Sequence, residues 1–406
     1  MSMEGIMKKA NVQGLAVIAI FLLTIFGFFI FTFVTPSKSM SLLENRKLAQ
    51  RPDLNKDNLL TGEYSKRFEQ YYNDQFPMRD SFIETNALIN KNFFRQNIIE
   101  DVYVADDGYL LSQIAEVTPA DAKQTAARIN ELATNLAKKN ISVYTALMPN
   151  KSTMMEDKFP AYFPSFGQKN MNLLYKELGK ASHPIDSRNA LAKHMNEDYM
   201  FFYSDHHWQA KAAFYAYQNV MSEINANEQT DNQVYQYNDY TWNLSGKPFL
   251  GSDARKTTSA NAKKTDTILV AQLKEKHQPY TMKWGNRTRS GLYNMDFLTM
   301  EDPYTNRYQA YLGGDYAQLL ITNPNKTNGK KVLVIKDSYA NAFIQFLVPH
   351  YKETHVLDLR HYNKMPIEKY VEKNNIDQIV LLYNINSIFV TPALTNFKHP
   401  GQGENQ

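Results

Sequence analysis

The chain has 406 residues, no cysteine, and 45 Lys and Arg against 41 Asp and Glu, which gives a formal net charge of +4. Basic and acidic residues are interleaved, so no basic block indicates a nucleic-acid partner. The lack of cysteine excludes disulfides, thiol catalysis and thiolate metal sites. The length suits two or three domains, or one large α/β domain with insertions.

The first element in chain order is an apolar segment. Residues 14–34 contain no charged side chain, and a helix of that length crosses the roughly 30 Å core of a membrane. Lys8 and Lys9 precede it, which predicts a cytoplasmic N-terminus over residues 1–13 and an extracellular remainder. A cleaved signal peptide is the competing interpretation, but its apolar region is usually shorter. We therefore predict a single-pass plasma-membrane anchor, followed by a linker over residues 35–57.

Regular patterns follow the linker. Residues 63–79 are helix-like and end near Pro77, and residues 102–104 and 109–111 form a plausible hairpin. Thr118 and Pro119 then begin a predicted helix, and residues 141–147 are the next strand. Strands that alternate with helices in this way are typical of a parallel sheet.

The middle of the chain differs from the rest in amino-acid composition. Residues 199–203 are predicted as a strand that runs into Ser204-Asp-His-His-Trp208, and residues 209–221 as a helix. Residues 225–330 are rich in Asn, Gln, Thr and Tyr, and we predict a β-rich insertion with turns at Gly251-Ser252 and Gly313-Gly314.

The most informative stretch comes near the end. The apolar run of residues 332–335 predicts a buried strand; Asp337 and Ser338 follow it, and a helix pattern begins. Residues 354–358 and 376–382 predict two more strands with a helix over 366–373 between them, and residues 391–406 a tail. A serine at such a junction would lie at the carboxyl edge of the sheet beside free helix N–H groups, where an oxyanion could be held. Simple helix capping by Asp337 and Ser338 is the alternative.

Asp205, His207 and Ser338 supply the residue types of a nucleophilic triad, which occurs in several chain orders. Side chains two apart in an extended segment share a face, so Asp205 could reach the ring of His207, and His206 would point the other way. The same cluster could bind zinc, but it offers only two imidazoles and one carboxylate. We expect no metal and no cofactor.

Four motifs together resemble the bacterial DHHW protein family. In chain order they are Glu44-Asn-Arg-Lys-Leu-Ala49, Met148-Pro-Asn-Lys151, Ser204-Asp-His-His-Trp208 and Ile335-Lys-Asp-Ser-Tyr-Ala-Asn341. That family is similar to the alginate O-acetyltransferases of the SGNH hydrolase superfamily. The resemblance implies an SGNH-hydrolase-like α/β/α sandwich with a mostly parallel sheet, circularly permuted, as a catalytic domain over residues 58–390.

The resemblance also implies a function and a set of roles. Asp205, His207 and Ser338 match the family's triad, which would transfer acetyl groups to an extracellular polysaccharide. A separate multi-pass membrane-bound O-acyltransferase would supply the acetyl groups. Candidates for oxyanion or substrate binding are Tyr339, Gly313, Gly314, Asn150, Lys151 and Asn384.

Two other functions remain open at the level of the sequence. An acetyl esterase of surface glycans would use the same triad, since the two activities differ only in whether water or a sugar resolves the acyl-enzyme. A non-catalytic scaffold of a polysaccharide-assembly complex would not need the triad at all.

Overall fold

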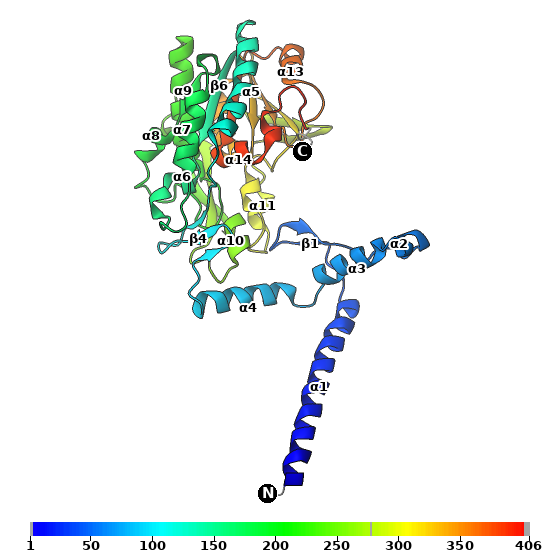
Figure 1. The fold of residues 1–406 in the computed structure, drawn as a ribbon. Helices are drawn as coiled ribbons and strands as arrows, with labels where there is room; N and C mark the ends of the chain where they lie inside the picture. Colours follow the sequence, from blue (N-terminus) through cyan, green and yellow to red (C-terminus); the bar gives the residue numbers. More distant parts are fainter. Residues whose placement is uncertain (1–2, 277, 402–406) are drawn as a thin grey trace. The chain divides into compact units, whose positions relative to one another are not determined.

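The computed structural model describes residues 3–276 and 278–401. The chain divides into two compact units (Figure 1): residues 1–96 with 258–261, and residues 97–257 with 262–406. The boundary therefore lies at Gln96, and our predicted domain start at residue 58 is wrong. Residues 58–96 belong to the first unit, where they pack on the N-terminal apolar helix and the segment after it.

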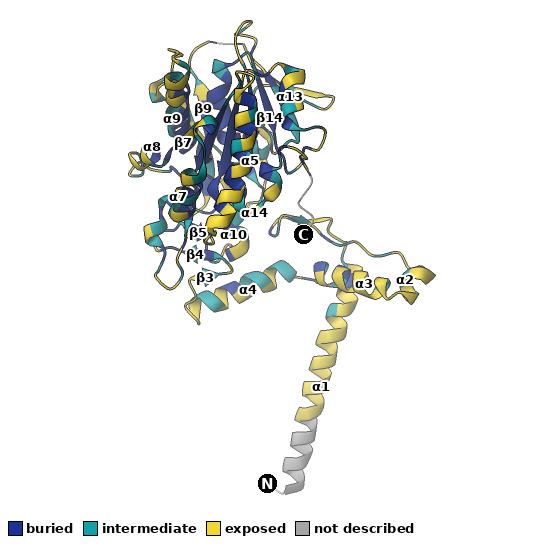
Figure 2. Cartoon of the chain, turned by 45° about the horizontal axis from the view of Figure 1, so that its top comes forward, coloured by how far each residue is buried: buried dark blue, intermediate teal, exposed yellow. Residues whose placement is uncertain are grey.

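The first unit begins with the apolar helix. Helix α1 spans Met3–Val34, and its described side chains are mostly exposed (Figure 2). Among the residues that the structure describes, its segment Gln13–Val34 is the one helix long and apolar enough to cross a membrane. The predicted apolar helix is thus confirmed, and its role as an anchor or a signal peptide is taken up below.

The predicted linker is structured over much of its length. Strands β1 (Met40–Ser41) and β2 (Arg46–Lys47) pair in antiparallel fashion, and Leu43 and Leu48 are buried. Helices α2 (Lys56–Leu60), α3 (Glu63–Asp74) and α4 (Arg79–Asn92) follow. The helix predicted from residue 63 ends before Pro77 as expected, and α4 was not predicted.

The motif around Glu44 has a structural role in this unit. Arg46 lies 2.6 Å from the carboxylate of Asp74 on α3, and Arg79 lies 2.5 Å from the carboxylate of Glu44. The N–H of Ala49 also donates to Asp74. These bonds tie the β1–β2 hairpin to the adjoining ends of α3 and α4.

The second unit contains a sheet of eight strands in the order β11-β10-β12-β14-β13-β15-β6-β7. Neighbours from β14 to β7 are parallel, whereas β11, β10 and β12 join in antiparallel fashion. The sheet is therefore mostly parallel. In chain order the strands are β6 (Ser142–Met148), β7 (Pro184–Asp186), β10 (Thr281–Trp284), β11 (Arg287–Ser290), β12 (Gln318–Thr322), β13 (Lys331–Lys336), β14 (Glu353–Leu357) and β15 (Gln378–Asn384).

Helices cover both faces of this sheet, and the strands are the most buried part of the unit (Figure 2). On β6, Tyr144 and Ala146 belong to one apolar cluster, while Val143 and Leu147 belong to the other. This alternation is what a strand covered on both faces requires. One face packs against α9 (Ala210–Glu228) and α12 (Ala340–Leu347), and the other against α5 (Pro119–Ala137), α7 (Gly167–Glu177), α13 (Ile367–Asn374) and α14 (Ile385–Val390).

Shorter elements complete the unit. The predicted hairpin is confirmed as β4 and β5, with β3 beside it, and Thr118 caps α5 with a reciprocal bond to Asp121. The remaining elements are β3 (Ile98–Ile99), β4 (Val102–Val104), β5 (Leu110–Ser112), α6 (Lys151–Met154), α8 (Arg188–Ala192), β8 (Tyr240–Phe249), α10 (Ser252–Thr257), β9 (Asp266–Leu273) and α11 (Asp296–Thr299).

Three predictions need correction or comment. Residues 199–203 form no strand, because Tyr199 has a φ of 64° and only a single bridge joins Phe201 to Trp208. The segment 225–330 is β-rich, but β10, β11 and β12 extend the main sheet, so a separate insertion is not what the structure shows. Residues 391–400 are no tail, since Leu394 and Phe397 are buried; residues 402–406 lie outside the described part.

Candidate active site

The serine lies where the sequence predicted it. Strand β13 ends at Lys336, Ser338 follows in a turn, and α12 begins at Ala340. Asp337 holds this turn: its Oδ1 accepts the N–H of Tyr339 at 2.9 Å, and its Oδ2 accepts the N–H of Asn384 at 2.9 Å. Burial raises the pKa of Asp337 above its ordinary value. The turn is thereby fixed to the carboxyl end of the neighbouring strand β15.

The predicted triad residues come together. Nε2 of His207 lies 2.8 Å from Oγ of Ser338, and Nδ1 of His207 lies 2.6 Å from Oδ1 of Asp205. Asp205 and His207 are buried, whereas Ser338 is half-buried and so keeps some access to solvent. This arrangement is the one that a base needs to take the hydroxyl proton of a serine.

Asp205 reaches His207 in a different way from the one predicted. The loop is not extended; Oδ1 of Asp205 accepts both the backbone N–H of His207, at 3.0 Å, and its ring Nδ1. Oδ2 of Asp205 accepts the N–H of Ser252 at 2.8 Å. Burial alone would raise the pKa of Asp205, but His207, His206 and the Ser252 N–H outweigh burial and hold that pKa well below its ordinary value.

Gly251 is a site residue that the sequence showed only as a turn. A Cβ atom placed on Gly251 would lie 2.2 Å from Cβ of Asp205, which no real contact allows. The N–H of Gly251 donates to Oγ of Ser204 at 2.9 Å. The loop that carries Asp205 therefore packs directly on the start of α10, and only a glycine fits at this point.

Two aromatic side chains join the histidine loop to the serine turn. The ring of Tyr308 stacks on His207 at 3.7 Å, and its hydroxyl donates to the carbonyl oxygens of Ser338 and Tyr339 at 3.1 and 3.2 Å. Nε1 of Trp208 donates to the carbonyl oxygen of Tyr339 at 2.9 Å. In the sequence Trp208 stood out only as part of the motif Ser204-Asp-His-His-Trp208, and Tyr308 carried no signal.

His206 does not point away as predicted. Its ring lies 3.7 Å from the ring of His207, and its Nδ1 lies 2.6 Å from Oγ of Ser252. Partial burial and the neighbouring His207 lower the pKa of His206 to about 3. Asp205, His206 and His207 could in principle converge on a metal. Such an ion would bind one ring nitrogen of His207 and would replace the bond of that nitrogen to Asp205 or to Ser338.

A buried ion pair between Lys151 and Asp253 stabilises the segment that precedes the histidine loop. Nζ of Lys151 lies 2.7 Å from Oδ2 of Asp253, and it donates to the carbonyl oxygens of Phe202 and Tyr203 at 3.2 Å each. Both charged side chains are almost fully buried. Oδ1 of Asp253 accepts a hydrogen bond from Ser112. Lys151 thus joins the end of β6 to the residues that precede the histidine loop.

Asp266 explains why residues 199–203 are irregular. Its two carboxylate oxygens accept the N–H of Tyr203 at 2.8 Å and the N–H of Ser204 at 2.7 Å. The hydroxyls of Tyr199 and Ser204 donate to the same carboxylate. Backbone groups that a sheet would otherwise pair are therefore bound by one side chain from β9.

The other predicted binding residues are dispersed. The N–H of Tyr339, which we predicted for an oxyanion, already donates to Asp337. Asn150 donates to Oδ1 of Asn384 at 3.3 Å, so this pair lies beside Asp337 at the edge of the sheet. Gly313 and Gly314 form a turn with φ of 88° and 113°, and within the described residues no hydrogen bond joins them to Ser338. An oxyanion or substrate role for these residues stays a prediction.

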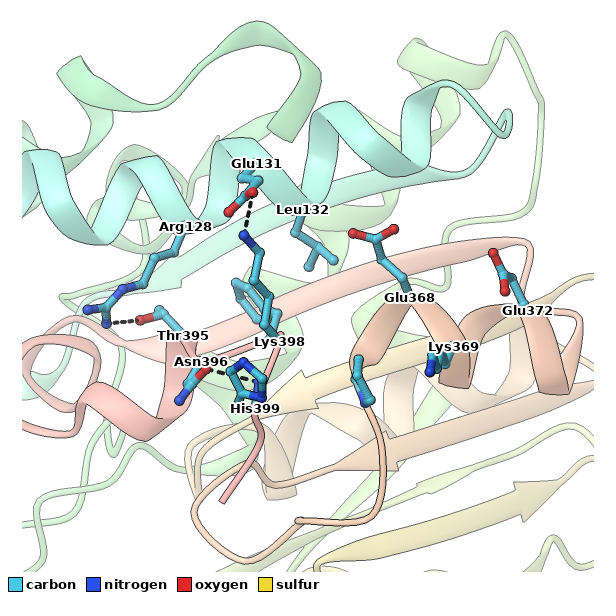
Figure 3. Close-up of a pocket in the computed structure, with 12 residues that line it drawn as sticks. Arg128, Glu131, Leu132, Glu368, Lys369, Glu372, Thr395, Asn396, Lys398 and His399 are labelled. Atoms are coloured by element: carbon cyan, nitrogen blue, oxygen red, sulfur yellow. Dashed lines mark hydrogen bonds and ion pairs between the residues drawn. The ribbon is translucent and has the colours of Figure 1, made fainter. Parts of the chain in front are cut away.

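A cavity of about 560 Å³ lies elsewhere in the second unit (Figure 3). It is lined by α5, α13 and the segment 395–399, and no triad residue contributes to it. Many of its charges are already paired: Glu131 lies 2.6 Å from Lys398, and Arg128 donates to Thr395 at 3.3 Å. The cavity is therefore separate from the triad.

Several solved structures are similar to this chain in fold. PatB1 from Bacillus cereus is 27% identical over 75% of this chain and 100% of that one, with a TM-score of 0.61. A second PatB1 structure, which carries a sulfonyl adduct, is 26% identical over 73% of this chain and 97% of that one, with a TM-score of 0.60. A DHHW family protein from Eubacterium siraeum shares the fold. It is 20% identical over 71% of this chain and 91% of that one, with a TM-score of 0.57.

No protein in the curated set matches significantly. Residues 99–357, which include Asp205, His207 and Ser338, match the DHHW protein family over more than half of the sequence. The chain therefore belongs to the DHHW protein family.

Proposed function

We propose that this protein is a membrane-anchored serine O-acetyltransferase that transfers acetyl groups to an extracellular polysaccharide. The observation that carries the proposal is the 2.8 Å approach of His207 Nε2 to Ser338 Oγ, with Asp205 behind the same ring at 2.6 Å. Family membership and the similarity to PatB1, which is known with a sulfonyl adduct, agree with a reactive nucleophile in this fold.

The chemistry follows from these three side chains. Oγ of Ser338 attacks the carbonyl carbon of an acetyl ester, and Nε2 of His207 takes the hydroxyl proton. When the tetrahedral intermediate collapses, His207 returns that proton to the departing oxygen, and Ser338 keeps the acetyl group. A sugar hydroxyl then attacks the acetyl-enzyme, gives its proton to His207, and Ser338 recovers the proton as it leaves.

Asp205 acts through the histidine. Its carboxylate accepts Nδ1–H, which fixes the tautomer with a free Nε2 and stabilises the imidazolium that forms during the reaction. Because the pKa of Asp205 is held well below its ordinary value, this carboxylate stays ionised when His207 is protonated. Tyr308, stacked on the ring, limits its rotation.

Two features of the chain suit an extracellular acceptor. The apolar segment Gln13–Val34 of α1 follows Lys8 and Lys9, as in a single-pass anchor with a cytoplasmic N-terminus. We further propose that a multi-pass membrane-bound O-acyltransferase supplies the acetyl groups. Water in place of the sugar would make the same enzyme an esterase, so the acceptor must be part of any assay.

The test is acetyl transfer by the full chain in detergent or nanodiscs, with a small aryl acetate as donor and soluble oligosaccharides as acceptors. We expect acetylated sugar and a trapped acetyl-enzyme with the wild type, and neither with Ser338→Ala. Ser290→Ala, an exposed serine on β11, is the matched control and should behave as the wild type. An active Ser338→Ala protein would refute the proposal, and ester hydrolysis without any transfer would assign the esterase activity instead.

A further inference from the structure

Helix α4 carries a stripe of apolar side chains that are exposed in the structure. Met78, Phe82, Ile89 and Phe93 recur at intervals of four, seven and four residues; Phe82 and Ile89 share one face of α4, and Met78 and Phe93 flank its two ends. Their exposed fractions are 62%, 50%, 50% and 81%. We call this set the apolar stripe.

The opposite, polar face of α4 forms hydrogen bonds to residues Ser259 and Ala260 of the first unit. Nζ of Lys91 donates to the carbonyl oxygen of Ala260, and Oε1 of Glu84 accepts a hydrogen bond from Ser259 at 3.1 Å. A helix on the surface of a water-soluble unit normally does the reverse, with its apolar face inward and its polar face in water. The sequence of α4 is therefore suited to an apolar medium on its outer side.

The apolar stripe is continuous with the membrane helix. Phe82, on the stripe, lies 5.9 Å from the ring of Phe28 of α1, and Phe76 lies 5.2 Å from the same ring. Two further α1 residues extend the contact: Phe29 lies 5.9 Å from Tyr72, and Phe33 lies 6.2 Å from Phe68. The last two turns of α1 thus pack on the aromatic side chains of α3 and the start of α4.

From this placement we infer that α4 lies in the interfacial layer of the membrane, with the apolar stripe turned toward the lipid acyl chains. Amphipathic helices bind membranes in this way, and aromatic side chains favour the interfacial depth. The partner is the lipid bilayer that α1 enters, because the stripe begins at the end of that helix. The inference rests on the proposed function in one respect, namely that α1 is a retained anchor.

The same contacts give α1 a second role. A leader that is cleaved would remove the three α1 rings that contact Phe68, Tyr72 and Phe76. With α1 retained, the anchor and α4 form one membrane-binding surface. The first unit is then held at the bilayer by two elements.

The natural chain has no cysteine, so single-cysteine labelling needs no background substitutions. Phe93→Cys in the full chain is labelled with an environment-sensitive fluorophore and reconstituted in nanodiscs of phosphatidylcholine and phosphatidylglycerol. Quenching is measured with a lipid that carries a nitroxide near its headgroup, and with aqueous iodide. Asp80→Cys, on the polar face of α4, and Asp106→Cys, a fully exposed site in the second unit, are controls, and Leu23→Cys in α1 reports on the anchor.

We expect the Phe93 label to be quenched by the lipid nitroxide at least twofold more than the Asp80 label, and to be protected from iodide at least threefold relative to Asp106. Ile89→Cys should give the same result from the middle of the apolar stripe. Iodide quenching of both stripe labels equal to that of Asp106 would overturn the inference, as would protection from iodide without quenching by lipid, which would indicate a protein partner. If either of these results is obtained while the Leu23 label is quenched by lipid, α1 is an anchor and only the placement of α4 is wrong. If the Leu23 label is not quenched by lipid, the anchor and the placement of α4 are both wrong.

Discussion

Nε1 of Trp208 donates a hydrogen bond to the carbonyl oxygen of Tyr339 at 2.9 Å. This bond joins the residue after His207 to the residue after Ser338, so the two halves of the triad are held to each other by a contact that is not itself catalytic. The indole ring of Trp208 also packs on the phenol ring of Tyr339, with 4.7 Å between the ring centroids. The last residue of the DHHW motif thereby sets the distance between base and nucleophile.

Trp208→Phe tests this relationship. The substitution keeps an aromatic ring but removes the N–H, so we expect kcat for acetyl-ester turnover to fall about tenfold with little change in KM, because the positioning of His207 relaxes while the substrate site remains. Unfolding should become easier by about 0.5 to 1.5 kcal/mol, because the carbonyl of Tyr339 loses one buried hydrogen bond and keeps the one from Tyr308. An unchanged kcat, with a lowered melting temperature alone, would assign Trp208 a purely structural role.

Asp205→Asn tests the histidine's orientation. The amide offers Nδ1 of His207 a donor as well as an acceptor and favours the wrong tautomer, so kcat should fall by about 10³- to 10⁴-fold while the fold persists. The matched comparison is Asp107→Asn, an exposed carboxylate of the same unit, which should have wild-type kcat. Circular dichroism and steady-state kinetics on both variants suffice. Retention of more than a tenth of the activity in Asp205→Asn would contradict the role given to this carboxylate.

Gly251→Ala should be among the most damaging single substitutions near the site. Its Cβ would lie 2.2 Å from Asp205, and neither backbone can move without breaking the Ser252 N–H bond to that carboxylate. We expect a loss of about 2 kcal/mol or more in unfolding free energy together with loss of activity. Gly285→Ala is the control, because a Cβ there meets nothing within 4 Å, and only its φ of 53° opposes the change. Comparable effects at both positions would show that the contact with Asp205 is not responsible.

His350 makes stability depend on pH. Its Nε2 lies 2.8 Å from the hydroxyl of Tyr217, which itself accepts the N–H of Tyr235. When His350 is unprotonated at Nε2, this nitrogen accepts the O–H of Tyr217. Burial and the nearby Lys326 lower the pKa of His350 to about 4.

Since the folded pKa lies below the ordinary value of about 6.5, the unfolded chain binds the proton more readily. The stabilisation is complete above pH 6.5 and is lost as the pH falls toward 4, with a slope of up to about 1.4 kcal/mol per pH unit. His350→Gln should flatten this part of the profile in denaturant titrations. The same slope in variant and wild type would show that other groups cause it.

The sequence was most informative where local pattern and residue type agree. Four consecutive apolar residues before Ser338 identified β13, and Thr118 with Pro119 identified the start of α5, because strand runs and caps are local signals. Asp205, His207 and Ser338 supply the residue types of a triad, but these types are common and do not by themselves show which residues meet. The family resemblance, rather than spacing alone, linked Asp205 to Ser338.

The rest depended on contacts between distant segments. Gly251 and Tyr308 reach the site from positions far along the chain, and a glycine in a turn or a tyrosine among 26 gives no local sign of this. Residues 199–203 resembled a strand in pattern, but Asp266 binds their backbone from outside. Helix α4 was not predicted, and the exposure of its apolar side chains could not be read from the sequence, because periodicity does not tell which face meets solvent.

The central claim is that Ser338 is the nucleophile, and covalent labelling tests it most directly. The full chain is treated with an aryl sulfonyl fluoride, and its intact mass and peptide map are recorded. We predict one adduct, on Ser338, whose formation is abolished by Ser338→Ala and slowed at least a hundredfold by His207→Ala. An adduct on a different residue, or one that forms equally in the Ser338→Ala protein, would contradict the claim.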